Sequence, residues 1–69
     1  MTQKELSYYE DAIGHEDNII KIITESINNL KDSEIISFME KEKSKHNEMK
    51  QRLMSVLEEK SNEWSVNNG

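Results

Sequence analysis

Apolar residues recur at alternating steps of three and four over most of this chain. In the first half the repeated positions are Leu6, Tyr9, Ile13, Glu16, Ile20, Ile23, Ile27 and Leu30. In the second half they are Ile35, Met39, Glu42, His46, Met49, Leu53 and Val56. This spacing places each set along one side of an α-helix, because three or four residues complete about one turn. The sequence therefore predicts an all-α fold with two amphipathic helices.

Local signals give the expected bounds of these helices. Thr2 and Glu5 have the spacing of a capping box, which marks the start of a helix. Asp32 or Ser33 is suited to the N-cap of the second helix. Within one domain, 1–69, we expect a first helix over about 3–30, a turn at 31–33, a second helix over about 34–61 and a frayed tail at 62–69.

The two helices are expected to form an antiparallel hairpin, because a turn this short joins antiparallel neighbours. Residues at one level along such a hairpin have numbers that add to roughly 65. Ile20 is then expected near His46, and Ile13 near Leu53.

The chain is too short to bury a large core by itself. It has 69 residues, and a domain of this size usually needs a disulfide, a metal or self-association. The absence of Cys excludes a disulfide framework and a thiolate metal site. The absence of Pro, with only two Gly, argues against a turn-rich β-domain. Self-association, or a metal held by His and carboxylates, remains.

The charge of the chain argues against two classes of partner. Nine basic and 14 acidic residues give a net charge of −5, which disfavours binding to nucleic acid or to an anionic membrane. No run approaches the roughly 18 apolar residues of a membrane-spanning helix, and the polar segment 2–5 is unlike a secretory signal. We therefore expect no nucleic acid and no membrane among the partners.

A second apolar line runs along the first helix, outside the stripe that faces its partner. It consists of Tyr8, Ala12, His15, Ile19 and Ile22. On a helical wheel Ile22 points nearly opposite Ile20, so a lone hairpin would leave it exposed. A contiguous line of exposed aliphatic residues indicates an interface. We expect hairpins to pair into a homo-oligomeric four-helix bundle, the alternative being a monomeric hairpin with some exposed Ile.

Three polar side chains interrupt the stripes: Glu16, Glu42 and His46. Buried charge needs a partner or a metal, so contacts among these groups, with Lys or with water, are one explanation. The other is a metal site, because two copies of the hairpin would supply carboxylates and histidines as di-iron bundles do. The spacing here is Glu-x-x-x-His rather than the Glu-x-x-His of those bundles. We expect no cofactor, with iron, manganese or zinc as the alternative.

Three segments carry a resemblance to a known family. They are Thr2–Glu16 (TQKELSYYEDAIGHE), Lys31–Ile36 (KDSEII) and Lys45–His46. Over roughly residues 2–57 the chain resembles the short spore coat proteins of the coat-F-like family of spore-forming Firmicutes. The resemblance implies half of a ferritin-like bundle, a structural or assembly role without a known reaction, and a cytoplasmic or spore location. It does not by itself supply a metal site.

These observations favour a protein that is not an enzyme. The chain has no Gly-rich phosphate loop and no Ser/His/Asp or Cys/His set in a rigid setting. We expect a non-catalytic helical assembly protein that self-associates, as a spore coat or sporulation component if the resemblance holds. Two alternatives stay open, a metal-binding ferritin-like homodimer and a small regulatory hairpin that docks on a partner protein.

Overall fold

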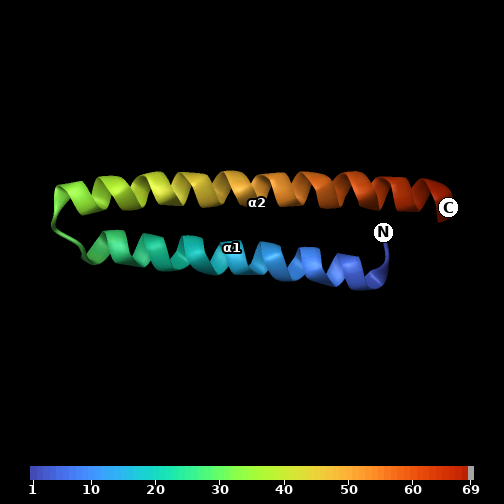
Figure 1. The fold of residues 1–69 in the computed structure, drawn as a ribbon, viewed down its shortest axis with the longest axis horizontal. Helices are drawn as coiled ribbons and strands as arrows, with labels where there is room; N and C mark the ends of the chain where they lie inside the picture. Colours follow the sequence, from blue (N-terminus) through green and yellow to red (C-terminus); the bar gives the residue numbers. More distant parts are fainter. Residues whose placement is uncertain (69) are drawn as a thin grey trace.

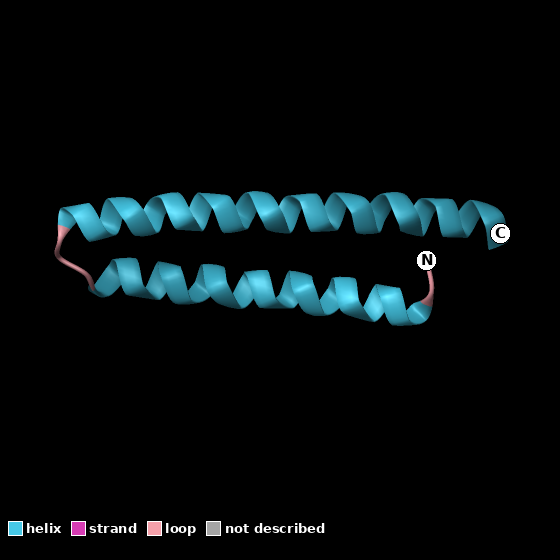
Figure 2. Cartoon of the chain, in the orientation of Figure 1, coloured by secondary structure: helices cyan, strands magenta, loops and turns pink. Residues whose placement is uncertain are grey.

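The chain forms two long antiparallel helices joined by a short turn (Figure 1). The structure is a computed structural model that describes the backbone of residues 1–68 and the side chains of residues 1–60. Helix α1 spans Gln3–Asn29 and helix α2 spans Ser33–Asn68. Loop is confined to the turn and to the start of the chain within this part (Figure 2). The predicted all-α hairpin is confirmed, as a layer whose Cα extents are 53 × 16 × 12 Å.

Thr2 and Glu5 start α1 through the predicted capping box. The Thr2 N–H donates to Glu5 Oε1 (2.9 Å), and the Glu5 N–H donates to Thr2 Oγ1 (3.1 Å). The Thr2 N–H, and then its hydroxyl, hold the pKa of the Glu5 carboxyl below its ordinary 4.5, because both stabilise the carboxylate. This contribution to stability is therefore present above pH 4.5 and is lost as the pH falls through the lower value of the folded chain.

Asp32 makes the turn into α2. Its Oδ1 accepts from the backbone N–H of Glu34 (2.9 Å) and of Ile35 (3.3 Å), so Asp32 rather than Ser33 caps the helix. Leu30 leaves α1 in extended backbone, with φ −91° and ψ 152°. No described residue needs the left-handed region, which is why this turn forms without glycine.

Helix α2 is longer than expected. It continues to Asn68 rather than ending at about 61, so the backbone of 62–68, which was expected to fray, is helical. The physical reason is that no Pro or Gly interrupts the chain between 33 and 68. The last residue of the expected tail, Gly69, lies outside the described residues. In Figure 1 the C-terminal end of α2 extends past the start of α1.

Two polar contacts across the seam show the register of the hairpin. Glu16 contacts His46, and Asp17 contacts Lys50. Both pairs lie within about one helical turn of the levels predicted for an antiparallel hairpin. The expected side-by-side arrangement of the two stripes is therefore present.

Packing between the helices seals very little from solvent. Among the described side chains only Ile23 and Glu16 are classed as buried, each 8% exposed, and none is fully buried. Most other residues of the two stripes are half-buried, because two helices in contact cover only one line on each. Neither helix, in the part described, has an apolar stretch long enough to cross a bilayer.

A substitution at Gly14 tests whether there is free space beside α1 at this position. A Cβ at this position would meet nothing within 4 Å, and glycine inside a helix costs about 1 kcal/mol against alanine. Gly14→Ala is therefore expected to raise the free energy of unfolding by about 1 kcal/mol. Urea unfolding followed by circular dichroism, at one chain concentration, measures the change.

The control is Ala12→Gly in the same helix, which should lose a similar amount of stability or more. A Gly14→Ala variant that is less stable than the wild type would show that another chain approaches α1 closely at this glycine.

Candidate interaction surface and the Glu16–His46 pair

A short polar contact between the helices joins Glu16 on α1 to His46 on α2. His46 Nδ1 lies 2.6 Å from Glu16 Oε2, so the ring N–H donates to the carboxylate. Both residues stand in the stripes that face each other, which is why the antiparallel register brings them together. The sequence placed Glu16 within one turn of His46, and the structure shows direct contact.

Burial makes this contact matter for stability. Glu16 is the one buried polar residue among the described side chains, and a buried carboxylate without a donor is costly. His46 supplies the donor while its own side chain keeps 27% exposure. The polar break in the apolar stripe is thus satisfied within one chain, the pairing that the sequence left open as one explanation.

Glu42 does not join this pair in a three-residue cluster. Its Oε1 lies 3.3 Å from Lys45 Nζ, on the same helix. No group of three or more His, Cys, Asp or Glu able to hold a metal ion is found among the described residues of the single chain. The metal site expected as an alternative drew on two copies of Glu16, Glu42 and His46, so a site shared between chains stays a prediction.

A second contact between the helices is an ion pair near the surface. Lys50 Nζ lies 2.6 Å from Asp17 Oδ1, with the Asp17 side chain 54% exposed. Glu48 and Arg52 pair along α2 at 3.1 Å, as expected from their spacing of four residues. Exposed pairs of this kind contribute roughly 0–1 kcal/mol. The Asp17–Lys50 pair therefore adds little to stability, but it identifies one face of the hairpin.

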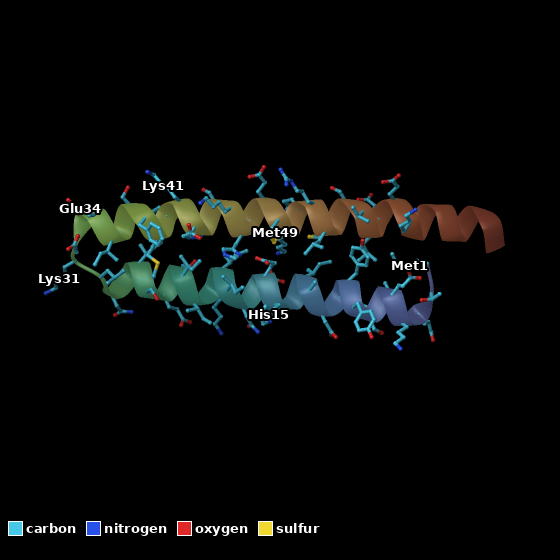
Figure 3. The ribbon with its side chains drawn as sticks, viewed as in Figure 1. Met1, His15, Lys31, Glu34, Lys41 and Met49 are labelled. Carbon is cyan, nitrogen blue, oxygen red and sulfur yellow. The ribbon has the colours of Figure 1, made fainter. Side chains whose placement is uncertain are left out.

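The second apolar line of α1 lies at the surface. Tyr8 is 63% exposed and Ile22 is 61% exposed, while Ala12 and Ile19 are half-buried. His15 is exposed and lies on the side of α1 away from α2 (Figure 3). The single hairpin therefore leaves large apolar side chains of this line in water, and their role in an interface stays a prediction.

Helix α2 adds exposed apolar residues that the sequence did not assign to an interface. Phe38 is 60% exposed and Met49 is 51% exposed, although Met49 stands in the stripe expected to face α1. Met54 and Ile35 are 42% and 46% exposed. In the sequence, Phe38 stands on the flank of the apolar stripe of the second helix. The pattern of one helix does not show on which face of the hairpin that flank lies.

The chain was compared with protein-family models, with curated proteins and with solved structures, and nothing matches in any of the three. The expected relation to coat-F-like spore coat proteins therefore stays a prediction, carried by the residues quoted above.

Substitutions in the buried pair test its contribution. His46→Leu leaves the buried Glu16 carboxylate without a donor, so the free energy of unfolding should fall by about 2 kcal/mol. Glu16→Leu should cost less, because the partly exposed His46 can reach water. The double variant should recover most of the loss, since two apolar side chains need no polar partner. Urea unfolding of the four proteins measures these differences.

One outcome of this unfolding experiment would contradict the prediction. A double variant whose loss equals the two single losses added together would show that Glu16 and His46 are not coupled.

Proposed function

We propose that this chain is a non-catalytic assembly protein that acts by self-association, with two hairpins packed as a four-helix bundle. The observation that carries the proposal is the mismatch between apolar surface and burial. No described side chain is fully buried, while Tyr8, Ile22 and Phe38 are each 60–63% exposed. Contiguous exposed apolar surface on a small protein is typical of an interface.

A second copy of the chain would stabilise the hairpin by covering this surface. Small domains without disulfides or metals usually gain stability from oligomerisation, and the chain has no Cys. A hairpin is half of an up-and-down four-helix bundle, in which each helix covers two neighbours. Pairing of two hairpins supplies the second neighbour that each helix lacks.

The resemblance over residues 2–57 suggests a place for such an assembly. Coat-F-like proteins are assigned to the spore coat without a known reaction, and a self-associating hairpin is a suitable component of a protein layer. On this proposal the chain is a spore coat or sporulation component in the cytoplasm or the spore, and it has no substrate.

Light scattering behind size-exclusion chromatography tests the self-association. The chain has a mass of 8.1 kDa, and the proposal expects a mass of at least twice this value at micromolar concentration. A mass of one chain at every concentration would contradict it. A monomer that binds another protein through the same residues would instead support the regulatory hairpin.

Metal binding is a second candidate function, and one observation favours it. Glu16 contacts Nδ1 of His46, which leaves Nε2 as the ring nitrogen that could bind a metal, and carboxylates commonly orient metal-binding histidines in this way. Glu42 lies one turn earlier on α2, where an i,i+4 pair can chelate. A second chain would have to supply further ligands, because four is the usual number for zinc.

Thermal melting with added metal tests this candidate. Zinc, manganese or iron(II) at millimolar concentration is expected to raise the melting temperature of the wild type by several degrees, because a ligand stabilises the state that binds it. His46→Ala should show no such rise, whereas His15→Ala, which removes the other histidine of the chain, should respond like the wild type. Equal melting curves with and without metal would exclude the site.

A further inference from the structure

The two broad faces of the hairpin differ in chemistry. One face, here called the groove face, carries the ion pair between Asp17 and Lys50. Next to it lies an open groove whose lining includes Glu10, Asp17, Met54 and Glu58. Acidic side chains from both helices therefore border this face. Among the described side chains, Met54 is its one large apolar residue with more than 40% exposure, at 42%.

Exposed apolar residues of both helices lie on the other face. At about 100° per residue, Tyr8 and Ile22 are about 180° and about 140° around α1 from Asp17. On α2, Phe38 and Met49 are about 160° and about 140° around the helix from Met54. Because Asp17 and Met54 line the same groove, the four apolar residues share the face opposite to it.

Antiparallel register brings these residues to neighbouring levels. The polar side chains of His15 and Lys45 lie among them, because they are about 160° around α1 from Asp17 and about 180° around α2 from Met54. Along the hairpin axis, Met49 lies between the level of the Glu16–His46 contact and that of the Asp17–Lys50 contact. Met49 is therefore level with the part of α1 between Ala12 and Ile19. Figure 3 shows Met49 near the middle of the hairpin. We call this surface the apolar face and define it as Tyr8, Ala12, Ile19, Ile22, Phe38 and Met49.

We propose that a second copy of this chain packs on the apolar face, so that Phe38 and Met49 of α2 bind together with the apolar line of α1. The inference rests on the proposed function and names the surface that performs it. Both helices contribute, as a four-helix bundle requires, because each helix of one hairpin must meet a helix of the other.

The size of the face agrees with this occupant. The 27 residues of α1 are about 40 Å long and the hairpin is 16 Å wide, so the two helices side by side present about 650 Å². This is close to the roughly 800 Å² that each partner of a stable interface buries. A short peptide or a single helix would leave part of the face in water. A second hairpin has the same extents and an apolar face of its own, so it covers the whole surface.

Charge also selects the apolar face over the groove face. Each chain carries a net charge of −5, so two copies repel each other. A contact that brings acidic side chains of the two chains close together is therefore disfavoured. Pairing through the groove face would bring Glu10 and Glu58 of two chains together, beside the Asp17 that Lys50 already pairs. Pairing through the apolar face keeps these carboxylates in water.

Lysine substitutions on the two faces test the inference by analytical ultracentrifugation. Ile22→Lys and Phe38→Lys place a charge on the apolar face. Each should raise the dissociation constant of the assembly by about thirtyfold. Met54→Lys is the matched control, with the same change of charge on the groove face and an effect of less than about threefold. Circular dichroism shows whether each variant keeps its helices.

Thiol protection gives a second measurement that does not require the assembly to be broken. The chain has no Cys, and Met49 and Met54 have similar exposure in the single hairpin, 51% and 42%. In the assembled protein a maleimide should label Met49→Cys at least about tenfold more slowly than in dilute solution. Met54→Cys should label at the same rate in both.

The outcomes separate the inference from the proposed function. Slow labelling of Met49→Cys alone, with a loss of affinity in the two apolar-face variants, supports the inference. An oligomer that protects Met54→Cys, or that tolerates Ile22→Lys and Phe38→Lys, overturns the inference and leaves self-association in place. A chain that stays monomeric at every concentration overturns both.

Discussion

Two helices can contact each other along only one line, and the rest of this structure follows from that constraint. Helix α1 has 27 residues and α2 has 36, yet Ile23 is the one apolar residue classed as buried among the described side chains. Added length extends the seam without making it deeper. Such a chain can have strong helix signals and a well-defined turn and still lack a sealed core, so the remaining apolar surface becomes its most informative feature.

The Glu16–His46 contact involves one of the two buried residues of that shallow seam, among the described side chains. An apolar pair of similar volume would need no desolvation of polar groups, so the contact adds little stability over such a pair. Its value lies in register, because a slip of one helix along the other by a turn would leave the buried carboxylate without its donor. Capping by Thr2 and Asp32 limits the ends of the hairpin, and the polar pair specifies its middle.

Self-association and metal binding depend on the same geometry. Each needs a second copy of the chain, the first to cover apolar side chains and the second to complete a ligand set around His46. The single chain satisfies Glu16 by itself and pairs Glu42 with Lys45. Assembly through apolar contacts leaves the Glu16–His46 contact in place, whereas a metal held by Glu42 would have to displace Lys45 from it.

The sequence by itself determined the two helices, the capping box at Thr2, the turn at Asp32 and the approach of Glu16 to His46. These are local or periodic properties, since a 3–4 spacing specifies one side of a helix and a short turn specifies an antiparallel partner. The end of α2 differs from the expected frayed tail at 62–69, because no Pro or Gly up to residue 68 interrupts the helix. Only the tertiary structure decided that Phe38 and Met49 share a face with Tyr8 and Ile22. A helical wheel gives angles around one axis, and the relation between two wheels is set by how the helices pack.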